Sequence, residues 1–179
     1  FLQRLRHGTV KQHRLTLIEG HNFKQMQIVI DHAPYIDHHV AGLKQHDLLK
    51  KMALKVPSLE GLLYPTTYFY TKGISDLELY RRAFLRMENV LHELWQGRAA
   101  GLPYKRPYDA LIVASLIQRE SHYVPEQPMV AAVIVNRLKK NMRLQIDAAV
   151  LYGLNRTAGP LKRSELKQSG AYNLYKKYG

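Results

Sequence analysis

One glutamate in the second half of the chain has the setting of a general acid. On a helix, Glu120 would continue an apolar stripe, because Leu116 and Ile117 precede it by four and three residues. It would also lie in the last helical turn, where unpaired carbonyl groups oppose negative charge. Both effects favour the protonated carboxyl that a general acid needs near neutral pH. The alternative is a glutamate at a helix end that extends into water or pairs with Arg119 or Arg137.

Three other acidic residues in this half could supply a second carboxylate. Asp147 follows residues 143–146, whose polar and apolar side chains alternate, so this segment could line a groove. The alternative role of Asp147 is that of a helix N-cap. Glu126 and Glu165 are the other candidates, and the residue pattern leaves the choice open.

Amide, guanidinium and aromatic side chains could bind a polar ligand beside these acids. Asn136 and Arg137 follow each other on one expected helix, where they could face the cleft or merely cover it. Residues 172–175 (Tyr-Asn-Leu-Tyr) place aromatic faces beside an amide, a composition suited to stacking on a sugar and hydrogen bonding to it. The alternative for residues 172–175 is an ordinary surface loop.

Metal and thiol chemistry have little support. The chain contains no cysteine, which excludes thiol nucleophiles, disulfides and cysteine-based zinc sites. A patch rich in histidine and aspartate lacks the regular spacing of metal ligands; its members are His32, Asp37, His38, His39, His46 and Asp47. We therefore predict neither a metal nor a cofactor.

The charge balance favours an anionic partner. Lysine and arginine number 27 against 14 acidic residues, so the formal net charge is +13. Nucleic acid, a membrane surface or an acidic polymer could each match this charge. The basic residues are scattered in short clusters, and no nucleic-acid-binding motif accompanies them. We therefore expect no nucleic-acid partner, and a nucleic-acid binder remains only as an alternative.

The elements that must position these residues indicate an α+β fold. A strand is expected over 13–18, a helix capped by Asn22 over 22–29, a helix over 47–52 and an irregular or edge strand within 60–70. Asp76 is expected to cap a long amphipathic helix whose buried face comprises Leu77, Tyr80, Phe84, Met87, Leu91 and Leu94.

Helices are also expected to carry the candidate site. One runs from Asp109 to about His122, hydrophobic nearly all round and therefore buried; another runs from Pro128 to Lys140 with Asn141 as the C′ residue. A short helix is expected from Asp147 to about Leu154. The chain thus divides into a small N-terminal part, 1–57, and a mostly helical part, 58–179. The apolar runs are too short to cross a bilayer, so we expect the chain as given to be soluble.

Several ordered motifs resemble those of one enzyme family. Residues 114–121 (ASLIQRES) resemble the ASIIEKE segment of the MltG/YceG-like endolytic murein transglycosylases. Residues 136–147 (NRLKKNMRLQID) resemble their NRLxxGMxLQTDP stretch, 171–175 (AYNLY) their PYNTY element, and 60–68 (EGLLYPTTY) their EGxxFPDTY. The matches cover nearly the whole chain. Gln118 replaces the first glutamate of the family's EKE, which leaves Glu120 as the remaining carboxylate there.

The resemblance implies an activity and a site. Family members cleave the MurNAc–GlcNAc bond within peptidoglycan strands and leave 1,6-anhydro-MurNAc ends, which would terminate or release nascent strands. Glu120 would be the catalytic acid and base, without metal or cofactor. The substrate-binding residues would be Gln145, Asp147, Asn173, Tyr175, Asn136, Arg137 and Tyr172.

The resemblance also implies a setting. Residues 1–57 would be the end of a LysM-like module, and the catalytic domain would continue beyond residue 179. A single N-terminal membrane helix, absent here, would anchor the protein in the bacterial inner membrane with the catalytic domain outside. Partners would be peptidoglycan strands and, among proteins, peptidoglycan synthases (penicillin-binding proteins). Two alternatives remain: a lysozyme-like hydrolase that uses Glu120 and Asp147, and a non-catalytic glycan-binding module.

Overall fold

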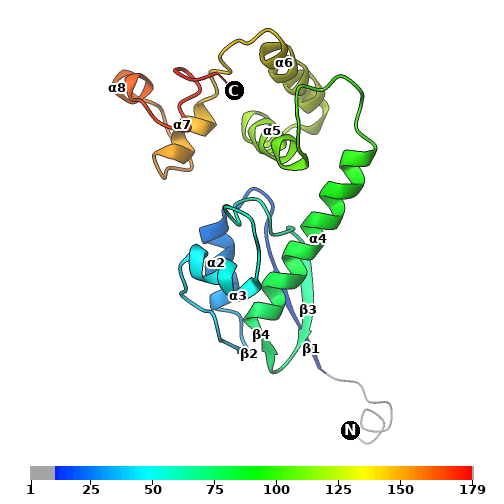
Figure 1. Ribbon diagram of the computed structural model, residues 1–179. Coiled ribbons are helices and arrows are strands. Elements are labelled where there is room, and N and C mark those ends of the chain that lie inside the picture. Colours follow the sequence, from blue (N-terminus) through cyan, green and yellow to red (C-terminus); the bar gives the residue numbers. More distant parts are fainter. Residues whose placement is uncertain (1–10, 179) are drawn as a thin grey trace, which may run out of the picture. The chain divides into compact units, whose positions relative to one another are not determined.

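Contacts between residues divide the chain into two compact units. The computed structural model describes residues 11–178, and the units are Phe1–Leu94 and Trp95–Gly179 (Figure 1). Several helices and two small sheets confirm the α+β class. The contact boundary differs from the expected division at 57/58, because a strand on each side of that point pairs with the other. The LysM-like nature of residues 1–57 stays a prediction, and its first ten residues lie outside the described part.

The first unit contains both sheets. Strand β1 (Gln12–Thr16) pairs antiparallel with β3 (Thr67–Thr71), and β2 (Ile36–Asp37) pairs parallel with β4 (Ile74–Ser75). The period of two along a strand buries Leu15 opposite Tyr68. The strand expected over 13–18 is thus confirmed in place, although it ends at Thr16.

Three helices complete the part of the first unit that the structure describes. Helix α2 (Phe23–Asp31) begins with the capping box of Asn22 and Gln25, as expected, and α3 (Gln45–Met52) covers the helix expected from residue 47. Helix α4 (Asp76–Gln96) buries Leu79, Tyr80, Ala83, Phe84 and Met87. The expected stripe was too long, because Leu94 is 67% exposed.

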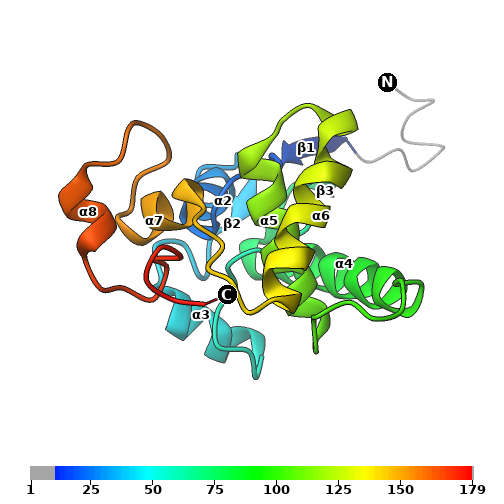
Figure 2. The ribbon, with the colours of Figure 1, turned by 90° about the horizontal axis from the view of Figure 1, so that it is seen from above.

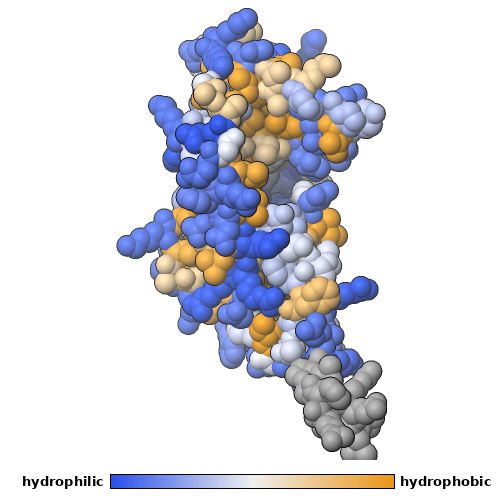
Figure 3. Space-filling model, turned by 90° about the vertical axis from the view of Figure 1, so that its right-hand side faces the viewer, coloured by the Kyte–Doolittle hydropathy of each residue, from blue (hydrophilic) through white to orange (hydrophobic). Residues whose placement is uncertain are grey.

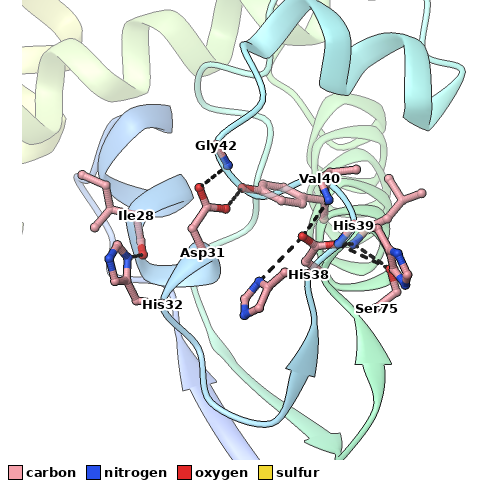
Figure 4. A network of polar contacts seen from close by, with 11 residues as sticks. Ile28, Asp31, His32, His38, His39, Val40, Gly42 and Ser75 are labelled. Carbon is pink, nitrogen blue, oxygen red and sulfur yellow. Dashed lines mark hydrogen bonds and ion pairs between the residues drawn. The ribbon is translucent and has the colours of Figure 1, made fainter.

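A fully buried carboxylate joins α4 to the loop after β2, in which Figure 4 labels His38, His39 and Val40. Asp76 is 0% exposed. Its Oδ1 accepts hydrogen bonds from the backbone N–H groups of His39 at 3.0 Å and Leu77 at 2.7 Å, and its Oδ2 accepts one from Val40 at 2.9 Å. Nδ1 of His38 lies 3.8 Å from Oδ2. Asp76 therefore satisfies backbone donors that would otherwise be buried without partners.

The neighbouring Asp31 holds the same loop from α2. Its Oδ2 accepts a hydrogen bond from the N–H of Gly42 at 2.9 Å, and the hydroxyl of Tyr80 donates to its Oδ1 at 3.4 Å. Nδ1 of His32 lies 2.8 Å from the carbonyl oxygen of Ile28. Of the His/Asp-rich patch, His32 is thus bonded to the backbone, while Nδ1 of His46 lies 3.4 Å from Oδ1 of Asp47. Within residues 11–178 no three such side chains lie close enough to hold a metal ion.

The second unit is built from short helices around a small core. Its elements are α5 (Pro107–Glu120), the 3₁₀ turn η1 (Val124–Glu126), α6 (Gln127–Lys139), α7 (Asp147–Gly153) and α8 (Arg163–Lys167). Helices α5 and α6 lie side by side (Figure 2). The buried core residues are Val113, Leu116, Ile134, Leu144, Ile146 and Ala149.

Two expectations about these helices were wrong and one is confirmed. Helix α5 is not buried all round: it buries Val113 and Leu116, whereas Ile112 is 45% exposed. Asp147 is the first residue of α7 rather than its N-cap, which is Ile146. Asn141 has the left-handed φ of 51° expected of a C′ residue after α6.

Apolar surface remains exposed on the second unit. Figure 3 shows apolar atoms among hydrophilic ones near the top of the face that it draws. Exposed large side chains of α5, η1 and α6 include Ile112, Val124, Met129 and Val133. In the described part of the chain, no helix has both the length and the hydropathy needed to cross a bilayer.

The buried Asp76 generates a stability prediction. Replacing it by alanine leaves the backbone N–H groups of His39 and Val40 without their acceptor, so we expect Asp76→Ala to lower the free energy of unfolding by about 3 kcal/mol. The matched control is Asp47→Ala, because the Asp47 side chain is 51% exposed; its loss should stay below about 1 kcal/mol. Urea unfolding measures both, and equal losses would contradict the anchoring role of Asp76.

Candidate functional site

The two candidate carboxylates lie at the ends of two helices that contact each other. Glu120 is the last residue of α5, and Asp147 is the first residue of α7. Leu116, one turn before Glu120, is buried in the core, and so are Ile146 and Ala149 on either side of Asp147. Shared packing of these apolar side chains therefore fixes the backbones that carry the two acids.

A tyrosine from the C-terminal segment completes this group. The hydroxyl of Tyr175 donates a hydrogen bond to Oδ1 of Asp147 at 2.5 Å. The bond to the Asp147 carboxylate, together with burial, raises the pKa of Tyr175 to about 12, and the negative charge of Glu120 adds to the shift. The phenol therefore stays protonated at neutral pH and keeps Asp147 oriented.

The pKa of the Glu120 carboxyl is raised above its usual value. The main cause is desolvation by partial burial, and the second is repulsion from the charge of Asp147. Glu120 was expected to continue the apolar stripe of its helix; the residue is instead exposed, one turn beyond the buried Leu116. Both causes favour the protonated form.

The two arginines considered as partners of Glu120 contact other groups. Arg119 donates through Nη2 to the carbonyl oxygen of Thr157, and Arg137 donates through Nη1 to that of Leu144. No ion pair joins either arginine to Glu120 in the described part of the chain. Arg137 lies close enough to Tyr175 for its positive charge to oppose the rise in the tyrosine pKa.

Side chains that received no specific role from the sequence hold the turn after α5. Ser121 is 8% exposed, and its Oγ donates to Oε2 of Glu126 at 3.0 Å. Nε2 of Gln127 donates to the carbonyl oxygen of Ser121 at 3.2 Å and to Oε1 of Gln118 at 3.4 Å. Glu126, considered above as a partner carboxylate, therefore anchors Ser121. The sequence signal that could have predicted this role is a small polar residue, Ser121, at the end of the apolar stripe.

The segment before α7 exposes alternate side chains. Leu144 and Ile146 are buried, whereas Gln145 and Asp147 are exposed, as the alternation indicated. Gln145 adopts a left-handed backbone with a φ of 54°. Its N–H donates to the carbonyl oxygen of Leu174 at 3.1 Å, which ties this segment to the turn that carries Tyr175.

Asn173 has a different role from the expected sugar contact. It is 5% exposed, and its Nδ2 donates to the carbonyl oxygens of Leu166 at 3.0 Å and Gln168 at 2.6 Å. Its Oδ1 accepts from the N–H of Tyr175 at 3.0 Å. The amide therefore shapes the turn and positions Tyr175, and both of its N–H donors are already used.

The remaining candidates lie at the margin of this group. Tyr172 is 50% exposed and contacts Tyr152 on α7. Asn136 is exposed in the last turn of α6, and no hydrogen bond of the described chain links its side chain to Glu120 or Asp147. The structure thus brings Glu120, Asp147 and Tyr175 together and gives the others peripheral or supporting places.

The site is open, and its groups suit acid–base chemistry. Hollows of about 290 Å³, lined by 98–102 and Tyr104, and about 420 Å³, beside β1 and β3, do not include the two carboxylates. A carboxyl with a raised pKa can donate a proton to a leaving oxygen and later take one up. The Asp147 carboxylate, oriented by Tyr175, can stabilise a neighbouring positive charge.

Comparisons with known proteins agree with the motifs. The model of the YceG-like family matches residues 1–179. The endolytic murein transglycosylase of Bacillus subtilis is 31% identical over 121 residues, which make up 68% of this chain and 33% of that protein. The enzyme of the same name from Streptococcus pneumoniae strain D39 is 26% identical over 127 residues, 68% of this chain and 22% of that protein.

A solved structure has a similar fold. The crystal structure of a YceG-like protein from Listeria monocytogenes superposes with a TM-score of 0.67 at 25% identity, over 99% of this chain and 64% of that one. The chain spans at most about a third of the length of the curated relatives that it matches. The family match covers every residue of the sequence, so the chain belongs to the YceG-like family.

Proposed function

We propose that this protein is an endolytic peptidoglycan lytic transglycosylase. It cleaves the MurNAc–GlcNAc bond within glycan strands and leaves 1,6-anhydro-MurNAc ends. The observation that carries the proposal is the placement of Glu120, at the end of α5, beside the hydrogen-bonded Asp147–Tyr175 pair, in a family whose curated relatives are named endolytic murein transglycosylases; the raised pKa of Glu120 agrees with it. An open site suits a long polymer that must be cut at internal bonds.

In the first step, Glu120 acts as the acid. Its carboxyl proton moves to the glycosidic oxygen while the bond from that oxygen to C1 of MurNAc breaks. Positive charge develops on C1 and the ring oxygen. The leaving GlcNAc end departs as an alcohol, and Glu120 is left as a carboxylate. The negative charge of Asp147 lies where it can stabilise the oxocarbenium-like centre.

In the second step, the same side chain acts as the base. The Glu120 carboxylate takes the proton of the C6 hydroxyl, and O6 forms a bond to C1, which closes the 1,6-anhydro ring. No water is consumed, and Glu120 returns to its protonated form. The nucleophile belongs to the substrate, so its attack is intramolecular and needs no activated water.

The other residues bind and position. Tyr175 holds Asp147 through the 2.5 Å hydrogen bond, and Asn173 holds Tyr175. The exposed side chains of Gln145, Asn136 and Tyr172 are available to sugars. Arg137 supports the segment that leads to Asp147 through its bond to Leu144.

The proposal includes a setting. The strands would be nascent peptidoglycan, with penicillin-binding synthases as protein partners and release of strands as the outcome. The full protein would be anchored in the bacterial inner membrane, with this domain on the outer side. The net charge of +13 supports proximity to anionic lipid and to the carboxylates of stem peptides.

Hydrolysis is the second candidate, because two carboxyl groups lie at the site. Asp147 could activate a water that attacks C1 after Glu120 protonates the leaving oxygen. Strands cut in this way carry a reducing MurNAc end. Their mass exceeds that of the anhydro product by one water, so mass spectrometry of the released fragments separates the two reactions.

The proposed reaction predicts both a product and a loss of activity. Purified strands should yield anhydro-terminated fragments, and Glu120→Gln should lower the cleavage rate by at least about 10³-fold, because the amide cannot transfer the proton. Unfolding temperature and circular dichroism should stay unchanged. Glu88→Gln, at an exposed position of α4, is the matched control. Unchanged cleavage by Glu120→Gln would refute the assignment, and reducing ends would favour hydrolysis.

The electrostatic link between the acids predicts a pH shift. A general acid must be protonated, so kcat/KM should fall as pH rises through the raised pKa of Glu120. Asp147→Asn removes a negative charge and lowers that pKa, so the alkaline limb should move to lower pH, whatever its effect on the maximal rate. The pH dependence of strand cleavage measures the shift. A limb at the same pH in both proteins would show that Asp147 does not influence the acid.

A further inference from the structure

Two exposed tyrosines pack against each other beside the proposed site. Tyr152 lies near the end of α7, and Tyr172 lies in the turn that leads to Tyr175. Their ring centroids are 4.9 Å apart, and their planes cross at 78°, which is an edge-to-face contact. Tyr152 is 39% and Tyr172 50% exposed. The pair therefore presents two perpendicular rings to solvent, and we call it the aromatic corner.

A glycine permits this arrangement. A Cβ atom on Gly153 would lie 3.1 Å from Cβ of Tyr172 and 3.3 Å from its Cδ2, closer than ordinary van der Waals contact. Gly153 thus allows the Tyr172 ring to lie directly against the end of α7, where it also contacts the ring of Tyr152. Two neighbouring residues of α7 thus determine where Tyr172 lies. Tyr152 contacts its ring, and Gly153 leaves room for it because it has no side chain.

The aromatic corner shares its supports with the proposed catalytic group. Helix α7 carries both Asp147, its first residue, and Tyr152 near its end. The C-terminal turn likewise carries both Tyr172 and Tyr175, and Tyr175 bonds to Asp147. A polymer bound at Glu120 could therefore reach the corner with an adjoining sugar.

We propose that Tyr152 and Tyr172 bind a pyranose ring of the glycan adjacent to the MurNAc whose glycosidic bond is cleaved. The weakly positive C–H groups on the face of a pyranose are attracted to the negative face of an aromatic ring. This inference rests on the proposed function, and it adds Tyr152 to the substrate-binding residues, with Gly153 as the residue that permits the position of Tyr172. The sugar at the corner does not react, so its binding stabilises ground state and transition state alike.

Kinetics of the full-length protein test the corner. Tyr152→Ala and Tyr172→Ala should each raise KM for glycan strands about three- to tenfold, with kcat nearly unchanged. Phenylalanine at either position should restore most of the lost affinity, because it keeps the ring face. Gly153→Ala keeps both rings but displaces Tyr172, so its KM should lie between the wild-type and Tyr172→Ala values.

The control is a variant of a tyrosine outside the aromatic corner. Tyr178→Ala removes a tyrosine that is 57% exposed and contacts Arg143 instead, so its KM should match the wild type. Wild-type KM in folded Tyr152→Ala and Tyr172→Ala would overturn the proposal, as would phenylalanine variants that are as weak as the alanine variants. If Tyr172→Ala does not fold, Tyr152→Ala decides.

A binding measurement separates this inference from the proposed function. In a Glu120→Gln background, calorimetry of intact strands should show the same loss of affinity for Tyr152→Ala. If Glu120→Gln still cleaves strands, the catalytic assignment fails. If it is inactive and Tyr152→Ala binds as tightly as its parent, only the aromatic corner fails.

Discussion

The hydrogen bond between Tyr175 and Asp147 is the interaction on which the site depends. At 2.5 Å it joins the C-terminal turn to the start of α7, next to the end of α5. It fixes the carboxylate whose charge opposes ionisation of Glu120. A charged acceptor strengthens the bond, and the raised tyrosine pKa keeps its proton in place. This one hydrogen bond therefore holds Tyr175 and Asp147 in place beside Glu120.

Backbone geometry keeps that contact in place. Asn173 uses its whole amide to shape the turn before Tyr175, and the bond from Gln145 to Leu174 joins the two segments. A buried polar group of this kind is costly unless it is fully paired, so the turn has few alternative conformations. The small core of the second unit is therefore sufficient to position the exposed side chains of Glu120 and Asp147.

Local signals in the sequence predicted where the helices lie better than they predicted which helix residues are buried or contact each other. Capping by Asn22, the C′ residue Asn141 and the start near Asp147 depend on nearby residues, so each could be located from the chain alone. Burial of α5, the amide bonds of Asn173 and the contact of Tyr152 with Tyr172 depend on tertiary packing, which no local pattern encodes. Glu120 was identified by its stripe, yet its exposure follows from how little covers the end of α5.

The ionisation of Glu120 itself is the most direct test of the account. Carboxyl-carbon NMR of glutamate-labelled protein, with the resonance assigned by Glu120→Gln, follows this titration without any substrate. The account predicts a midpoint above the ordinary glutamate pKa of about 4.3 and a lower midpoint in Asp147→Asn. A midpoint at or below the ordinary value in the wild type would contradict it.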